Sequence, residues 1–143
     1  MPEPYTIDAS VFLNAWDTRE AGRQASYDFL RRAGIVHAAL FLPTLVLPEV
    51  AASATRNGNP SRGTSLVEAI KRSVNVRFIE LDREFADLAV TVATRSRLRG
   101  SDAVYAAVAL RYSTVLVTRD GEMRQRLVGI VTAQTPEEAL ALL

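Results

Sequence analysis

Short apolar runs alternate along the chain with longer segments in which apolar residues recur every three or four positions. The short runs are rich in Val, Ile, Leu and Phe, which is typical of buried strands, and the longer segments have the period of amphipathic helices. The predicted strands are residues 5–8, 38–42, 76–81, 114–117 and 129–132. Because helices separate consecutive strands, the pattern predicts a three-layer α/β/α sandwich on a central, mainly parallel five-stranded sheet.

Capping and turn residues mark the ends of several predicted helices. Asp82 stands before an amphipathic segment, where an N-cap is expected, and Thr135 with Glu138 forms the pattern of a capping box. Gly34 is predicted to end a helix over residues 20–33. These signals therefore predict helix ends in both halves of the chain.

The polar stretch 55–63 is the least structured part of the pattern. It is rich in Asn, Gly, Ser and Arg, which is typical of a loop. Ser65 and Glu68 then have the spacing of a capping box, so a helix is predicted from there to about residue 72.

The segment after the second predicted strand carries two prolines and one glutamate. Pro43 is predicted to end the strand, and Pro48 is compatible with a helix only in its first turn. The helix is therefore expected to begin near Val46 or Leu47. This start places Glu49 in the first turns of a helix, close to the carboxyl end of the strand.

The composition describes an ordinary globular chain and excludes several classes of site. With 143 residues, 48% hydrophobic and 23% charged, we expect one domain over residues 1–143. The absence of cysteine excludes disulfides, thiolate catalysis and cysteine-based zinc sites. Prolines interrupt the richest apolar run, 38–50, so we expect no membrane span. The amino-terminal residues lack the pattern of a secretory signal, and we expect a cytoplasmic protein.

Four acidic residues share the same kind of position in the predicted fold. Asp8, Glu49, Asp102 and Asp120 each lie just past a strand or in the first turn of a helix. Single carboxylates at such positions commonly cap helices. However, the carboxyl ends of parallel strands meet at one edge of the sheet, where α/β proteins bind ligands. We therefore expect these four side chains to lie close together.

Carboxylates that converge repel one another unless a cation holds them. Mg²⁺ and Mn²⁺ prefer oxygen ligands of this kind, and such ions support phosphodiester hydrolysis by neutralising charge at the phosphate. Other chemistries fit less well. His37 is the only histidine and has no serine–aspartate context for a catalytic triad, and no glycine-rich phosphate loop is present.

The acidic residues lie in four motifs that resemble those of PIN-domain ribonucleases, and most closely the VapC-like toxins of bacterial and archaeal toxin–antitoxin pairs. The motifs occur in family order and together cover almost the whole chain. They are Ile7-Asp8-Ala9-Ser10-Val11, Leu47-Pro48-Glu49-Val50-Ala51, Gly100-Ser101-Asp102-Ala103-Val104-Tyr105-Ala106-Ala107 and Leu116-Val117-Thr118-Arg119-Asp120.

The resemblance implies a PIN-like fold and an endoribonuclease that depends on Mg²⁺ or Mn²⁺. By position, Asp8, Glu49, Asp102 and Asp120 would be the catalytic acids that hold the metal. Ser10 and Thr118 would orient ligands or water through their hydroxyl groups. Glu122 is the nearest candidate for a fifth acid found in some relatives. The resemblance also implies an RNA substrate (tRNA, rRNA or mRNA), a homodimer, and inhibition by a small antitoxin that presents an arginine to the acids.

Two alternatives remain open at this point. One is a nuclease of the same fold that acts on DNA or in RNA processing, although the chain has no obvious DNA-binding addition. The other is a catalytically silent module that binds RNA or protein.

The basic residues give little further guidance on the substrate. The net charge is +1, and of the 17 basic residues only Lys71 is a lysine, a ratio that a codon bias towards arginine also explains. Arginines that flank the site segments are candidates for contacts with RNA, although any one of them could be solvated surface. These are Arg56, Arg62, Arg99 and Arg119.

Overall fold

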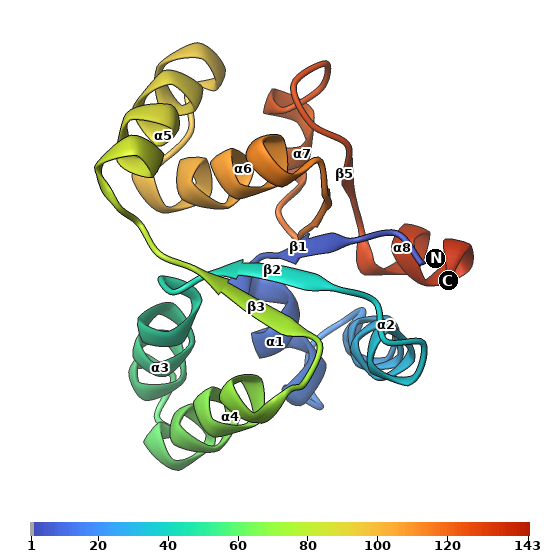
Figure 1. Ribbon diagram of the computed structural model, residues 1–143. Coiled ribbons are helices and arrows are strands. Elements are labelled where there is room, and N and C mark those ends of the chain that lie inside the picture. Colours follow the sequence, from blue (N-terminus) through green and yellow to red (C-terminus); the bar gives the residue numbers. More distant parts are fainter. Residues whose placement is uncertain (1) are drawn as a thin grey trace.

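The computed structural model describes residues 2–143, and its centre is a parallel five-stranded sheet (Figure 1). The strands lie in the order β3-β2-β1-β4-β5, and every neighbouring pair is parallel. Their bounds are β1 Tyr5–Ile7, β2 Leu40–Pro43, β3 Val76–Ile79, β4 Val115–Val117 and β5 Ala133–Gln134. The parallel sheet predicted from the sequence is confirmed.

Helices cover both faces of this sheet. Figure 1 shows α1, α2, α3 and α4 below the strands and α5, α6 and α7 above them, while α8 lies beside α2 at the end of the sheet that carries β5. Their bounds are α1 Ala9–Trp16, α2 Arg23–Ile35, α3 Val46–Arg56, α4 Pro60–Arg72, α5 Arg83–Ser96, α6 Gly100–Tyr112, α7 Gly121–Arg126 and α8 Pro136–Leu142. The expected three-layer α/β/α sandwich is therefore present.

The central strands are buried on both faces, which explains why they read as continuous apolar runs. Tyr5 and Ile7 of β1 pair in register with Val115 and Val117 of β4, and all four side chains lie in the core. Because the strands are parallel, their carboxyl ends meet along one edge of the sheet, from which α1, α3 and α7 begin. This edge positions the site.

The predicted loop over residues 55–63 is wrong. Helix α3 continues to Arg56, and α4 already begins at Pro60, so Asn57 to Asn59 alone connect them. The Asn59 side chain accepts a hydrogen bond from the backbone N–H of Arg62 at 3.1 Å, and Pro60 occupies the first helical position. This N-cap replaces the capping box expected at Ser65 and extends the helix by about one and a half turns.

Other boundaries also differ from the prediction. Helix α2 begins only at Arg23, after Gly22 with a φ of 78°, and it passes through Gly34 to end at Ile35. The last strand lies at Ala133–Gln134 instead of 129–132, because Gly129 takes a left-handed turn with a φ of 82°. The prediction places Gly129 inside the strand and marks no turn at Gly22.

The remaining end signals are confirmed. The Asp82 side chain accepts from the backbone of Phe85 at 2.9 Å, and Thr135 and Glu138 form the expected reciprocal capping box. Pro48 lies at the third position of α3, within the first turn, where proline costs little. Across residues 2–143, the helices are too short or too polar to cross a bilayer.

Candidate active site

All four acidic residues singled out from the sequence line one cavity at the carboxyl edge of the sheet. We call this cavity, of about 460 Å³, the acidic pocket. Its lining residues are Asp8, Ala9, Ser10, Leu13, Leu45, Pro48, Glu49, Ala52, Ser53, Arg56, Arg99, Ser101, Asp102 and Asp120. The topology therefore brings together acids that are up to 112 positions apart in the sequence (120 − 8 = 112).

Asp8 lies where β1 ends and α1 begins, and it is only 7% exposed. It occupies the N-cap position, yet within residues 2–143 its side chain makes no capping hydrogen bond. Instead, its Oδ2 accepts from the hydroxyls of Ser10 at 2.7 Å and Thr118 at 2.8 Å. The simple capping interpretation therefore does not describe Asp8.

The two hydroxyl groups are themselves held in a defined orientation. The Ser10 Oγ accepts from the backbone N–H of Arg119 at 3.2 Å, and the Thr118 Oγ1 accepts from the N–H of Asp120 at 3.1 Å. Because each hydroxyl accepts from a backbone donor, its own hydrogen is free to point at Asp8. The loop after β4 thus orients the donors that support the Asp8 carboxylate.

Burial raises the pKa of Asp8, and repulsion from Asp102 adds to this effect. The hydrogen bonds from Ser10 and Thr118 oppose the rise, because they favour the charged form. An acid held in this balance is a typical feature of a functional site.

Glu49 enters the acidic pocket from the first turn of α3 and is bonded to Tyr105 of α6. The Tyr105 hydroxyl donates to Glu49 Oε1 at 2.7 Å, and the tyrosine ring is fully buried. Partial burial raises the pKa of Glu49, the tyrosine hydrogen bond lowers it, and the nearby charges of Asp8 and Asp102 raise it. These three carboxylates therefore lie close enough to influence one another.

Asp102 and Asp120 share one guanidinium. Asp102 lies in the first turn of α6, and its Oδ2 accepts from Arg99 Nε at 3.2 Å. Asp120 caps α7, where its Oδ1 accepts from the N–H of Met123 at 3.1 Å, while its Oδ2 lies 3.8 Å from an Arg99 nitrogen. Asp120 is therefore both a cap and a member of the acidic pocket.

The donor set fits a hard divalent cation by its chemistry. Four carboxylates line one cavity, and their oxygens are the ligands that Mg²⁺ and Mn²⁺ prefer. In the described part of the chain, however, no three acidic side chains are already arranged around one point. Each acid is engaged by a protein donor instead: Ser10 and Thr118 on Asp8, Tyr105 on Glu49, and Arg99 on the other two.

The four arginines predicted to contact RNA separate into two pairs. Arg56 and Arg99 line the acidic pocket. Arg62 instead donates to the carbonyl of Trp16, and the guanidinium of Arg119 bonds to Asn14, Ser26, Gly22 and Glu137. Glu122, the candidate fifth acid, is paired with Arg126 in an adjoining cavity.

Sequence reasoning did not assign a role to Tyr105. A signal was available, because Tyr105 lies three positions after Asp102 on a predicted helix and hence on the same face. An apolar helix with an inward tyrosine is usually read as core, and only the structure shows that its hydroxyl reaches Glu49.

If the acidic pocket holds a metal ion, as the resemblance to PIN-domain ribonucleases implies, Tyr105→Phe is expected to reduce the activity about tenfold, as for other changes to groups that orient metal ligands. The substitution removes the donor to Glu49 but keeps the buried ring. The pKa of Glu49 should rise further, so the loss of activity should grow as the pH is lowered. A pH–activity profile of both proteins tests this, and parallel profiles would show that Tyr105 serves packing alone.

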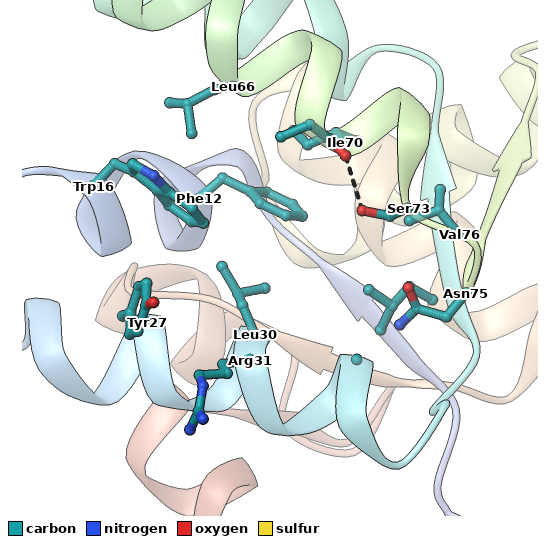
Figure 2. Close-up of a pocket in the computed structure, with 13 residues that line it drawn as sticks. Phe12, Trp16, Tyr27, Leu30, Arg31, Leu66, Ile70, Ser73, Asn75 and Val76 are labelled. Atoms are coloured by element: carbon teal, nitrogen blue, oxygen red, sulfur yellow. Dashed lines mark hydrogen bonds between the residues drawn. The ribbon is translucent and has the colours of Figure 1, made fainter.

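A second cavity, of about 280 Å³, lies between α1, α2 and α4 and is mainly apolar. Figure 2 shows Phe12 and Trp16 of α1 facing Tyr27 and Leu30 of α2, with residues of α4 on the third side. Trp16 and Tyr27 meet edge to face with ring centroids 5.8 Å apart, and Trp16 remains 36% exposed. The cavity could accept an apolar side chain.

Comparisons with solved structures show which proteins share this architecture. PAE2754 from Pyrobaculum aerophilum is 20% identical with a TM-score of 0.72, covering 97% of this chain and 88% of that one. VapC20 from Mycobacterium tuberculosis, described as a toxin that cleaves the sarcin–ricin loop, is 17% identical with a TM-score of 0.69, covering 85% and 93%. DNA-bound VapBC from Salmonella typhimurium is 16% identical with a TM-score of 0.69, covering 95% and 99%. At these identities the likeness establishes the fold.

The family is established by the sequence itself. A comparison with curated protein sequences finds no match. The family model described as the PIN domain, in contrast, matches residues 5–126, which include all four acids and both hydroxyl residues. This range is most of the chain, and it agrees with the resemblance in the four sequence motifs. The chain belongs to the PIN-domain family.

Proposed function

We propose that this protein is a metal-dependent endoribonuclease that hydrolyses RNA phosphodiester bonds in the acidic pocket. The observation that carries the proposal is the convergence of Asp8, Glu49, Asp102 and Asp120 on one cavity at the carboxyl edge of the sheet. Membership of a family of nucleases supports the same activity.

Asp8, Glu49, Asp102 and Asp120 would hold Mg²⁺ or Mn²⁺. When bound, such an ion neutralises charge on the phosphate and makes water a better nucleophile at neutral pH. The chain's own contribution is to orient the ligands: Ser10 and Thr118 fix the carboxylate of Asp8, and Tyr105 fixes that of Glu49. Such supporting hydrogen bonds set ligand direction and basicity.

For contacts with RNA we retain Arg56 and Arg99, since both line the acidic pocket. Arg62 and Arg119 are less suited to this role, because their guanidinium groups bond to other residues of this chain. Specificity for one RNA would then depend on the shape of the pocket rim and on a small number of such contacts.

We further propose that the protein is the toxin of a toxin–antitoxin pair, acts in the cytoplasm and forms a homodimer. Support comes from the fold it shares with VapBC complexes and with a toxin–antitoxin complex from Klebsiella pneumoniae. The apolar cavity beside Trp16 offers a place for an antitoxin side chain (Figure 2).

Antitoxin binding can be followed through Trp16, the single tryptophan of the chain. We expect co-expression with the protein encoded beside this one to yield a stable complex. Its formation should shift the Trp16 emission to shorter wavelength, since the exposed part of the ring becomes covered. Separate elution of the two proteins would contradict the pairing, and unchanged emission in a stable complex would place the partner elsewhere.

The nuclease proposal is tested by incubating purified, antitoxin-free protein with total cellular RNA in the presence of Mg²⁺, Mn²⁺ or EDTA. We expect discrete RNA fragments with either metal and none with EDTA. Cleavage of DNA but not RNA would favour the alternative substrate. Intact RNA under all conditions, at every protein concentration, would favour a catalytically silent binding module.

A further inference from the structure

Arg99 is the one basic side chain described above that contacts carboxylates of the acidic pocket. It lies at the N-cap position of α6, three residues before Asp102, to which its Nε donates at 3.2 Å. A second nitrogen of the same guanidinium lies 3.8 Å from Asp120 Oδ2. One positive charge thus bridges two of the four acids that would hold a metal.

Arg99 also lies in the walls of two cavities. The acidic pocket and an adjoining cavity of about 320 Å³ both have Arg99, Asp102 and Asp120 in their walls. The adjoining cavity is completed by residues of α7, including Glu122 and Arg126. Movement of Arg99 away from Asp102 and Asp120 would therefore uncover carboxylates that both cavities share.

The Arg99 side chain is exposed enough to move away from the two carboxylates. It is 79% exposed, whereas the side chains of Asp102 and Asp120 are 12% and 33% exposed. Ion pairs with one exposed partner contribute little to stability, so displacing Arg99 costs little. A divalent ion carries twice its charge and takes oxygen ligands directly.

We propose that Arg99 is a built-in competitor for the metal: its guanidinium bridges Asp102 and Asp120 until a divalent cation displaces it, so that Arg99 sets the metal concentration at which the acidic pocket fills. This inference rests on the proposed function, because it requires that the four acids bind a metal. Arg99 then acts as a positioning residue, through the carboxylates that it contacts.

The first test measures Mn²⁺ binding by calorimetry, without RNA, for the wild type, Arg99→Gln and Arg56→Gln. Both variants lose one positive charge from the same pocket, but only Arg99 bridges two of the acids. We expect Arg99→Gln to bind Mn²⁺ about three- to fivefold more tightly, as for the loss of a weak ion pair. Arg56→Gln should show a clearly smaller change.

An equal gain in both variants would mean that general electrostatics, and not the bridge, sets the affinity. Unchanged or weaker binding by Arg99→Gln would also overturn the proposal, as would the absence of Mn²⁺ binding in all three proteins. Arg99→Lys, which keeps the charge but loses the planar fork, should fall between the wild type and Arg99→Gln.

The second test follows the displacement itself. Phenylglyoxal modifies accessible arginine side chains, and peptide mapping by mass spectrometry reports the extent at each position. Saturating Mn²⁺ should raise the modification rate of Arg99 in the wild type while leaving that of the exposed Arg19 unchanged. A rate at Arg99 that is unaffected or slowed by Mn²⁺ would show that the guanidinium stays in place.

Neither test uses RNA, so the outcome is separate from that of the nuclease assay. If the wild type cleaves RNA but Arg99→Gln shows no gain in Mn²⁺ affinity, the proposed function would be supported and the competitor role of Arg99 would be contradicted. If Arg99→Gln binds Mn²⁺ more tightly but the wild type leaves RNA intact, the competitor role of Arg99 would be supported and the nuclease proposal would be contradicted.

Discussion

Asp8→Asn is expected to lower RNA cleavage at least a hundredfold while leaving the protein folded and at least as stable as the wild type. Changes to groups that merely support metal ligands cost about 10–100-fold, and Asp8 would be a ligand itself. The amide oxygen of Asn can still accept from Ser10 and Thr118, so the local hydrogen bonds survive. The charge that is buried beside Asp102 is removed.

The stability of this variant should depend on pH in a defined direction. Because burial raises the pKa of Asp8 above its ordinary value of 3.8, the ionised side chain destabilises the fold at neutral pH. This destabilisation is absent below the unfolded-state pKa and grows as the pH rises through the folded-state pKa. The gain of Asp8→Asn in unfolding free energy should therefore be largest near neutral pH and should shrink on acidification.

Cleavage assays and denaturant unfolding at several pH values test both parts. The natural comparison is Asp82→Asn, a true N-cap that bonds to Phe85 and lies outside the acidic pocket. That variant should keep full activity. If Asp8→Asn instead lost several kcal/mol of stability, Asp8 would be a structural residue and the metal-site assignment would fail.

Arg119→Met is expected to have the largest effect on stability, lowering the free energy of unfolding by about 2–4 kcal/mol. The guanidinium donates to Asn14 Oδ1 at 3.1 Å, to Ser26 Oγ at 2.8 Å and to Glu137 Oε2 at 2.7 Å. It thereby connects the loop after β4 with α1, α2 and α8. Its loss leaves buried polar groups of Asn14 and Ser26 with fewer partners.

The same arginine explains the glycine at the start of α2. Gly22 has a φ of 78°, and a Cβ built there would lie 2.8 Å from the Arg119 Cζ. The guanidinium also donates to the Gly22 carbonyl. The sequence therefore needs glycine here both for the left-handed backbone and for the close approach of Arg119.

Thermal and denaturant unfolding measure the effect, with Arg19→Met as the matched control. The Arg19 side chain is 85% exposed and forms a salt bridge with Asp17. Its loss should therefore change the free energy of unfolding by less than about 0.5 kcal/mol. Arg119→Met should lower Tm by about 5–15 °C in a domain of this size. Equal stability of the two variants would return Arg119 to the group of possible RNA contacts.

Much of this protein is determined by local sequence. The period of the apolar residues establishes the alternation of strands and helices, and the alternation implies a parallel sheet with all carboxyl ends at one edge. Asp82, Thr135 and the placement of Pro48 fix helix starts through interactions within one turn of the chain. For the same reason the sequence alone predicts that the four acids lie at one edge of the sheet.

Other features depend on contacts between residues that are distant in the sequence. No local pattern shows that Tyr105 reaches Glu49, that Arg119 faces inward to Ser26, or that Arg99 bridges two acids. The sequence determined which residues arrive at the site, because strand and helix periods are local. The tertiary structure alone decided which donors meet each carboxylate, because those partners come from other elements and are selected by packing.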